Sequence, residues 1–403
     1  MRLFYLLYIC LLFSINNTSY SFFEDIEFEG ELFLSGRYFP SGPEYSSQKN
    51  NNSSLALKTE FFYEFEQQDS IVVSPFIRLD SSDSNRSKAD LREFLYTSYG
   101  EDWELSFGIG QVFWGVAESK NLVDMVNQVD EVEDAFGLTK LGQPLANLTF
   151  IRDEGYFEAY VMPYFRPRTL PGKKGRLRTD PHFLKNNPKF EGGNQWTPEL
   201  ALRWLNTYGE IDLSAHLFFG YAKNPSIDIR VIDGITNYGA AYQRIRQLGG
   251  TLQRTSGSTL YKMEYIVRDG QRDANRNRNG FISTVTGIEY NFYRIMGDNT
   301  DLSLILEYIY DSRRDRSSEL LQDDLFMASR WSLNDNFNSE VFVSSIFDLD
   351  GDGQTYQFEF SRRITDSLSG TLKSAIYQNG RKGSTLYILR QDSWLEVEFK
   401  YFF

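Results

Sequence analysis

The last segment of the chain, Asp392 to Phe403, alternates apolar and polar residues and ends on an aromatic side chain. Its apolar positions are Leu395, Val397, Phe399, Tyr401 and Phe403, and the charged positions between them are Glu396, Glu398 and Lys400. Residues two apart share a face of a β-strand, so one face is apolar and the other charged. Such a strand fits a sheet that covers a core, or a transmembrane barrel that turns its apolar face to lipid and its polar face to an aqueous lumen.

The same two-residue period returns along the rest of the chain in segments of about ten residues. The apolar positions that show it best are Leu55, Leu57, Phe61, Tyr63, Phe65, Ile211, Leu213, Ala215, Leu217, Phe219, Tyr221, Tyr261, Met263, Tyr265, Val267, Leu302, Leu304, Leu306, Tyr308 and Tyr310. No amphipathic helix of comparable length competes with this pattern. The chain is therefore expected to be all-β.

The connections between these segments alternate in length. Tight turns occur at 67–69, 99–101, 153–155, 208–209, 255–257, 334–336 and 365–367, and longer polar loops lie near 40–53, 80–88, 114–144, 166–196, 223–241, 269–280, 312–322, 349–353 and 379–391. Outer-membrane barrels have short periplasmic turns and longer outer loops, which assigns the long loops to the cell exterior. Nine long loops predict a transmembrane antiparallel β-barrel of about 18 strands, within a range of about 16 to 18, built by residues 22–403 as one domain.

The N-terminus has the layout of a secretory signal peptide. Arg2 precedes an apolar run over residues 3–15, and small residues precede an expected cleavage point after Ser21, so residues 1–21 would be removed. The run is too short to span a bilayer as a helix. The only cysteine, Cys10, lies inside it, so the exported chain would have neither a disulfide nor a thiolate metal site.

Composition narrows the function further. The chain has a formal net charge of −13, and an acidic chain has no excess of cations to neutralise phosphates, which argues against a nucleic-acid partner. A mean hydropathy of −0.43 argues against a helical membrane protein but not against a barrel, because only every second strand residue has to be apolar. A barrel of about 16 to 18 strands is too wide for its side chains to fill, so its size alone predicts an aqueous channel.

The long loop after the fifth strand, Trp114 to Pro144, is acidic. A loop of about 30 residues is usually functional, and this one is long enough to fold back into the lumen and narrow it. The alternative is a solvated surface loop. The residues expected at the constriction are Trp114, Glu118, Asp124, Asn127, Asp130, Glu131, Glu133 and Asp134.

The following long loop, Arg166 to Trp196, is basic, and its principal cations are Arg166, Arg168, Lys173, Lys174, Arg176 and Arg178. An acidic and a basic segment that face each other across a pore would set up a transverse field that orients dipolar solutes and discriminates by charge. The alternative for the basic loop is contact with lipopolysaccharide phosphates.

Four short stretches carry a family resemblance: Leu91-Arg92-Glu93, Trp103-Glu104-Leu105, Gln111-Val112-Phe113-Trp114-Gly115 and Val123-Asp124-Met125-Val126-Asn127. Together they resemble the signature region of a proteobacterial outer-membrane family, known as a domain of unknown function and treated as porin-like barrels. Its members follow a Gln…Trp-Gly motif with Val-Asp-x-x-Asn-Pro, and this chain has Gln128 in place of the proline. The resemblance implies that Trp114, Asp124 and Asn127 belong to an inward segment. The alternative for Trp114 is a place in the aromatic girdle of the barrel.

A possible calcium motif lies near the C-terminus. Asp348, Asp350, Asp352 and Glu359 match the spacing of an EF-hand loop, which needs a helix on either side. Both flanking segments alternate as strands, which would draw Glu359 into the sheet. A Gly-Asp hairpin turn is therefore the main interpretation, with a weak outer-loop calcium site at the three aspartates as the alternative.

Catalysis requires a nucleophile and a base. Ser214 and His216 share one face of a strand and would form such a pair in a hydrolase, although the alternation places them on the lumen side, away from lipid substrates. The favoured function is a non-enzymatic, porin-like outer-membrane channel for small solutes or apolar compounds. The alternatives are that hydrolase and a structural or adhesive barrel. The expected partners are outer-membrane lipid, lipopolysaccharide, a small solute and the barrel-assembly machinery, with no cofactor and no nucleic acid.

Overall fold

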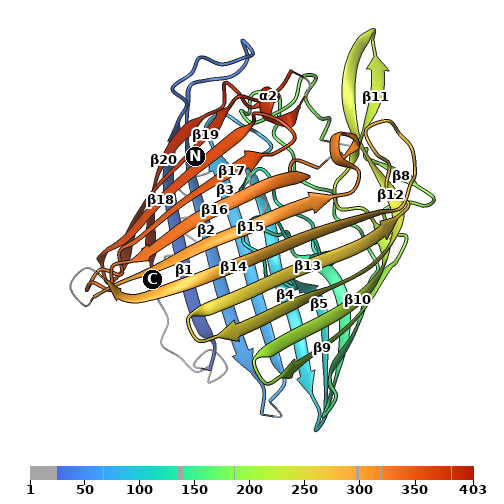
Figure 1. Ribbon diagram of the computed structural model, residues 1–403, viewed down its shortest axis with the longest axis vertical. Coiled ribbons are helices and arrows are strands. Elements are labelled where there is room, and N and C mark those ends of the chain that lie inside the picture. The colour runs from blue at the N-terminus through green and yellow to red at the C-terminus, as the bar shows by residue number, and fades with distance from the viewer. Residues whose placement is uncertain are drawn as a thin grey trace, which may run out of the picture.

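The computed structural model describes residues 25–403 except 67, 135–138, 186, 296–298, 318 and 383, and this part of the chain forms a closed antiparallel β-barrel (Figure 1). It contains twenty strands, of which β8 and β11 pair only with β12 and lie outside the closed ladder. The other eighteen pair antiparallel in chain order, and β20 returns to pair with β1 through residues 395–402 and 31–38. The predicted all-β barrel and its strand number are confirmed.

The strands of the barrel are β1 (Glu27–Tyr38), β2 (Asn51–Glu64), β3 (Ser70–Asp80), β4 (Lys88–Tyr99), β5 (Trp103–Gly110), β6 (Gln143–Arg152), β7 (Gly155–Met162), β9 (Glu199–Tyr208), β10 (Ile211–Tyr221), β12 (Ile235–Ser256), β13 (Thr259–Asp269), β14 (Phe281–Ile295), β15 (Thr300–Asp311), β16 (Asp323–Ser332), β17 (Glu340–Asp348), β18 (Gln354–Thr365), β19 (Leu368–Gln378) and β20 (Trp394–Phe402). The helical content of the described chain is small and consists of α2 (Thr385–Ile388) and η2 (Arg314–Arg316). No described helix is long and apolar enough to cross a membrane. The predicted signal peptide lies outside the described residues.

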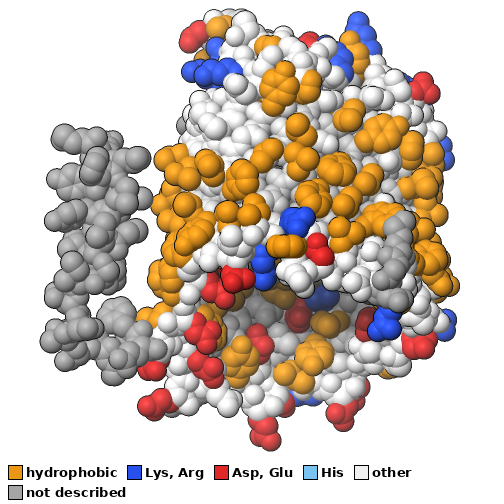
Figure 2. Space-filling model, turned by 90° about the vertical axis from the view of Figure 1, so that its left-hand side faces the viewer, with side chains coloured by type: hydrophobic (Ala, Val, Ile, Leu, Met, Phe, Trp, Pro, Cys, Tyr) orange, Lys and Arg blue, Asp and Glu red, His pale blue; other side chains and the backbone are white. Residues whose placement is uncertain are grey.

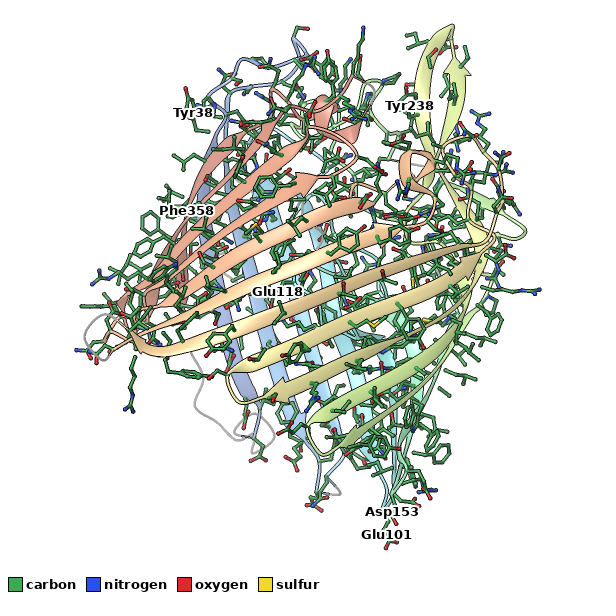
Figure 3. The ribbon with its side chains drawn as sticks, viewed as in Figure 1. Tyr38, Glu101, Glu118, Asp153, Tyr238 and Phe358 are labelled. Atoms are coloured by element: carbon green, nitrogen blue, oxygen red, sulfur yellow. The ribbon has the colours of Figure 1, made fainter. Side chains whose placement is uncertain are left out.

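Short turns lie at one end of the barrel and long loops at the other. Figure 3 shows Glu101 and Asp153 at the turn end and Tyr38 and Tyr238 at the loop end. The long connections correspond to the nine loops expected from the sequence.

Two of those loops contain strands that the polar pattern did not predict. The loop expected over 166–196 contains β8 (Lys189–Glu191). The loop expected over 223–241 is instead a hairpin of β11 (Ser226–Ile232) with the start of β12, and it projects beyond the barrel rim (Figure 1). Its turn residues Asp233 and Gly234 have φ angles of 51° and 75°, which is the left-handed conformation that tight hairpins favour.

The outer face of the barrel is apolar. On the closing strand β20, Leu395, Val397 and Phe399 are each 42% exposed, whereas Glu396 on the opposite face is buried. Figure 2 shows apolar side chains spread over the outer wall between the two ends. The predicted alternation on this strand is confirmed, and the apolar face points outwards as a lipid-facing surface requires.

The C-terminal residue completes the closure. The backbone N–H of Phe403 donates to the Gly30 carbonyl at 3.0 Å, and the Gly30 N–H donates to the Phe403 carbonyl at 2.8 Å. A Cβ atom at position 30 would lie 2.5 Å from the Phe403 ring. Glycine at this position therefore makes room for the terminal aromatic side chain.

Candidate functional site

The inner face of the barrel has two different sides. On the first, which we call the packed wall, strands β6 to β16 turn apolar side chains inwards, and these pack against residues 112–126 of the β5–β6 segment. The buried residues of this cluster are Trp114, Leu122, Val123, Met125, Val126, Leu145, Tyr160, Met162, Ala201, Phe218, Ala222, Ile245, Ile266, Phe281, Val285, Ile305, Ile309, Phe326 and Ala328. The packed wall therefore fills its side of the lumen.

The second side, which we call the open wall, consists of the inward faces of β18, β19, β20, β1 and β2 towards the turn end. Nearer the loop end, β19 and β20 bury Ala375, Tyr377 and Trp394 in a separate apolar cluster. The side chains of the open wall include Glu359, Lys373, Lys400 and Glu31, which are 44%, 38%, 32% and 26% exposed. Their ion pairs are loose, at 3.9 Å for Glu359 with Lys373 and 3.4 Å for Glu31 with Lys400. Charged groups that stay partly exposed inside a barrel mark an aqueous side of the lumen.

The β5–β6 segment, residues 111–142, is held on the packed wall by two carboxylates of the barrel. Glu264 on β13 accepts hydrogen bonds from the backbone N–H groups of residues 116, 117, 122 and 123, at 2.7 to 3.4 Å. Glu307 on β15 accepts from the N–H groups of Glu118 and Ser119 and from the Ser119 hydroxyl. Because both carboxylates are buried, these bonds fix the segment to the inside of the barrel, where Figure 3 places Glu118.

The residues that carry the family resemblance hold this segment together. Asp124 accepts from the N–H of Trp114 at 2.6 Å and pairs with Lys140 at 2.6 Å. Asn127 donates to the carbonyls of residues 110 and 141 and accepts from the N–H of residue 112, which ties the two ends of the segment to its middle. Gly115 leaves room for the Asn121 side chain, whose amide oxygen would lie 2.2 Å from a Cβ at this position.

Trp114 and Gln128 connect the segment to its surroundings. The Trp114 ring lies 5.6 Å from the Tyr160 ring and 5.2 Å from His216, so this tryptophan is buried inside the barrel and is not part of an outer girdle. Gln128, which stands where the family has proline, donates to the Lys223 carbonyl at 3.0 Å. Gln128 therefore connects the segment to the residues that follow β10.

The predicted carboxylates of the segment are compensated by cations. Glu118 lies between Lys262 at 3.6 Å and Arg330 at 3.4 Å. Further along, Asp130 pairs with Lys88 and with Arg92 at 2.6 Å, Glu131 with Arg168 at 3.3 Å, and Glu133 with Arg78 at 2.7 Å. Asp134, the last of these carboxylates, is not without an interaction partner either. Although burial opposes its ionisation, Lys88 and Arg92 hold the pKa of the Asp130 carboxyl below its usual value.

The basic loop meets the acidic segment directly. Asp130 and Thr169 form a β-bridge, and Arg168 reaches Glu131, so the two segments touch at these points. A transverse field between the two segments stays a prediction. The loop then continues to the far side of the barrel mouth, where Arg176 pairs with Asp392 at 2.5 Å.

The other predicted cations of this loop have different environments. Arg166 pairs with Asp90 at 2.6 Å, and the Arg178 guanidinium lies 4.1 Å from the centre of the Tyr45 ring. Lys173 and Lys174 are exposed at the surface. Only part of the basic loop is therefore available to solutes or lipids outside the barrel.

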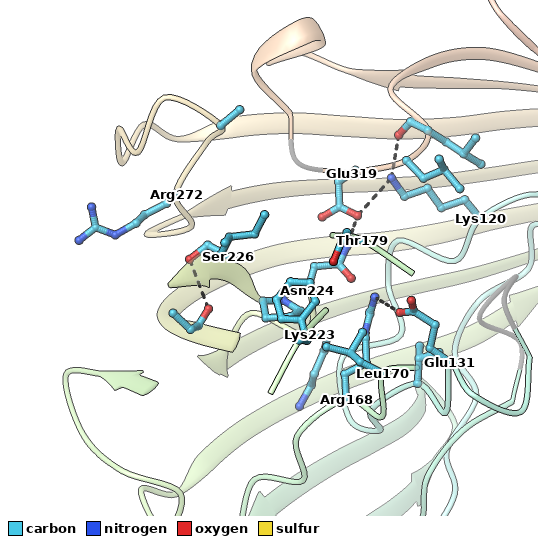
Figure 4. Close-up of a pocket in the computed structure, with 18 of the residues that line it drawn as sticks. Lys120, Glu131, Arg168, Leu170, Thr179, Lys223, Asn224, Ser226, Arg272 and Glu319 are labelled. Carbon is cyan, nitrogen blue, oxygen red and sulfur yellow. Dashed lines mark hydrogen bonds and ion pairs between the residues drawn. The ribbon is translucent and has the colours of Figure 1, made fainter. Parts of the chain in front are cut away.

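A cavity of about 990 Å³ lies at the loop end and is lined by residues of both segments and of the neighbouring loops and strands (Figure 4). Its lining includes Lys120, Asn224 and Glu319, and Glu319 accepts a hydrogen bond from Asn224 and pairs with Lys120 at 3.6 Å. Burial opposes the ionisation of Glu319, but Lys120, Arg313 and Arg268 outweigh it and lower the pKa of this carboxyl to about 2. The cavity forms an outer vestibule with fixed charges of both signs.

Ser214 and His216, the pair that the hydrolase alternative requires, form hydrogen bonds with residues of the neighbouring strand β12. The Ser214 hydroxyl shares a hydrogen bond of 2.7 Å with Thr251, and the His216 ring bonds Gln247 at 2.9 Å. Both side chains are buried on the inner face. The arrangement is a polar ladder between neighbouring strands.

The possible calcium motif lies between two strands, β17 and β18, as the alternation of its flanking segments predicted. Glu359 lies in β18 as expected and faces Lys373, away from the turn that carries Asp348, Asp350 and Asp352. Asp348 accepts a hydrogen bond from the N–H of Asp350 within that turn. Among the described residues, no group of three or more His, Cys, Asp or Glu is placed to hold a metal ion.

Comparisons with known proteins support the fold. No protein-family model and no curated protein sequence matches the chain. Solved structures do match: Pseudomonas aeruginosa OpdO, at 10% identity and a TM-score of 0.54 over 94% of this chain and 97% of that chain, and a BenF-like porin from Pseudomonas fluorescens Pf-5, at 7% and 0.54 over 94% and 97%. Pseudomonas aeruginosa OccK5 matches at 9% identity and a TM-score of 0.53, over 94% and 98%. The chain therefore has the fold of porin-like outer-membrane barrels, and the family suggested by its sequence motifs stays a prediction.

Proposed function

We propose that this protein is an outer-membrane channel through which small solutes pass along the open wall of the barrel. The observation that carries the proposal is the division of the lumen into a side filled by apolar side chains and a side with exposed charged groups. The packed wall is filled by the β5–β6 segment, whereas the charged side chains of the open wall keep part of their surface exposed. Trp114, Glu118, Asp124, Asn127, Asp130, Glu131, Glu133 and Asp134 then act as a constriction that narrows the lumen from the opposite side.

The surroundings of the barrel fit this role. The apolar outer face suits lipid, and the exposed Lys173 and Lys174 at the loop end suit the phosphates of lipopolysaccharide. Phe403, at the end of the closing strand, is the feature we propose for recognition by the barrel-assembly machinery. Vestibule residues such as Ile227 and Phe183 provide apolar contacts, so uptake of apolar compounds belongs to the same proposal.

The test is single-channel recording from the refolded protein, residues 22–403, in a planar lipid bilayer. We expect discrete current steps from a protein that also shows heat-modifiable migration in electrophoresis. A folded protein that inserts but carries no current would contradict the channel and favour a structural or adhesive barrel.

A further inference from the structure

We infer that the carboxylates of the open wall, and not those of the acidic β5–β6 segment, select cationic solutes in this channel. The inference rests on the proposed channel function and adds a solute class to it: small cations, including solutes that carry an amine.

The segment carboxylates contribute little because their charge is already balanced. Asp130 contacts two cations of the barrel, Lys88 and Arg92, and Glu133 contacts Arg78. A carboxylate and a cation in contact act on a passing ion as a dipole, whose field falls off faster with distance than that of a single charge. These pairs therefore serve mainly to attach the segment to the barrel.

The open wall differs because some of its carboxylates have no cation at ion-pair distance among the described residues. These are Glu29, Glu60 and Glu398. Glu29 and Glu60 stand directly opposite each other in the β1–β2 ladder, which is an unfavourable position for two like charges. Glu398 lies opposite Ser35 and Thr371, so its nearest cross-strand neighbours are uncharged, and it interacts electrostatically with Arg78 at longer range.

The environment strengthens the effect of these three charges. They sit inside a barrel, where surrounding protein focuses the field on the aqueous path. Figure 2 shows further Asp and Glu side chains around the hollow at one end of the barrel. Lys58, two residues from Glu60 on the same face of β2, has no carboxylate at ion-pair distance among the described residues and offsets one of these charges. A cation entering the lumen meets the negative potential of the remaining carboxylates along the wall that stays accessible to water.

The experiment measures the reversal potential of the full-length exported chain in a KCl gradient from about 0.01 to 0.1 M, where the Debye length is about 30 to 10 Å and screening is weak. The wild-type channel should prefer cations. The triple variant Glu29→Gln, Glu60→Gln and Glu398→Gln should lower the ratio of cation to anion permeability by about twofold or more. The single variant Glu60→Gln, which relieves the repulsion with Glu29, should change it in the same direction.

Two further variants serve as controls. Asp233→Asn, Asp315→Asn and Asp352→Asn make the same change of net charge at exposed positions of the outer loops and should leave the reversal potential nearly unchanged. Glu133→Gln with Arg78→Gln, which removes a segment carboxylate together with its cation, should change it less than the open-wall triple variant does.

The outcomes are distinguishable. An open channel that prefers anions, or one whose selectivity responds to the segment variants and not to the open-wall variants, would overturn the inference and leave the channel intact. A wild-type protein that folds but conducts no ions would overturn the proposed function itself.

Discussion

The packed wall and the open wall are built from strands with the same two-residue period, yet their inward positions differ in kind. On β14 and β15 the inward residues include Val285, Ile305 and Ile309, which would face water if nothing covered them. On β20 and β1 the corresponding positions are Glu398, Lys400 and Glu31. Apolar surface left in water is unfavourable, so the first set requires a covering segment and the second does not.

The comparison explains where the β5–β6 segment lies. Residues 112–126 bring their own apolar side chains to the packed wall, and Glu264 and Glu307 satisfy the backbone N–H groups that would otherwise be buried without partners. Inward apolar residues thus indicate which part of a wide barrel is filled, and inward charged residues indicate which part stays wet.

The largest effect on the free energy of unfolding is expected at Trp114, which connects the β5–β6 segment to the packed wall. Trp114→Ala would leave a cavity beside Tyr160 and His216 and should lower the free energy of unfolding by about 4 kcal/mol. Urea unfolding in detergent, followed by tryptophan fluorescence, measures this change. Trp196→Ala is the control, because that side chain is 70% exposed and its loss should cost less than about 0.5 kcal/mol.

A second variant tests the ionic attachment of the segment. Asp130→Asn removes the nearest carboxylate of Lys88 and Arg92, which keep only Glu133 at 3.8 Å and Asp90 at 3.1 Å, and should cost about 3 kcal/mol at neutral pH. The pKa of Asp130 is lower in the folded than in the unfolded chain, so its charge stabilises the fold above the unfolded pKa of about 4 and loses this effect as the pH falls through the folded pKa.

Urea unfolding of the wild type and of Asp130→Asn at pH 7 and at about pH 3 tests this pH dependence. The difference in stability between wild type and Asp130→Asn should shrink at the lower pH. An unchanged difference would mean that the carboxylate charge of Asp130 does not stabilise the fold.

A third variant loosens the segment without removing apolar contacts. Glu264→Gln replaces a carboxylate that accepts four backbone hydrogen bonds with an amide that has one acceptor oxygen, and should cost about 2 kcal/mol. The freed segment should also increase current fluctuations in single-channel recordings. Glu101→Gln, at an exposed carboxylate in the turn between β4 and β5, is the matched control and should change neither quantity.

The smallest effect on stability is expected on the open wall. Glu359→Gln removes a partly exposed pair with Lys373 at 3.9 Å and should change the free energy of unfolding by less than about 0.5 kcal/mol. A loss of several kcal/mol in the same urea titration would show that this wall is packed after all.

Much of the barrel was predictable from the sequence because each strand repeats one simple pattern. The alternation of Leu395, Val397 and Phe399 with charged residues, together with the nine long loops, was enough to predict an eighteen-stranded barrel. The hairpin over 226–241 was missed because the stretch was assigned as a whole to a polar loop, although Ile227, Ile229 and Val231 alternate with polar residues ahead of the Asp233-Gly234 turn.

The candidate site was less predictable, because its contacts join residues distant in sequence. The acidic character of Asp130 and Glu133 suggested a free negative charge, whereas Lys88 and Arg78 come from strands some 40 to 55 residues earlier and compensate both. The anchoring role of Glu264 and Glu307 was also missed. Their strands do carry a signal, since Ile266 and Ile305 are apolar residues on the same inward faces.

The most direct test of the account compares the two walls within one barrel by cysteine labelling, since the sequence has only Cys10, which lies in the predicted signal peptide. Thr371→Cys places a thiol on the open wall, and Val285→Cys places one on the packed wall. A cationic methanethiosulfonate reagent added during single-channel recording should reduce the current through the Thr371→Cys protein within minutes and leave the Val285→Cys protein unaffected. Block of the Val285→Cys channel with no effect at Thr371→Cys would contradict the assignment of the conducting path to the open wall.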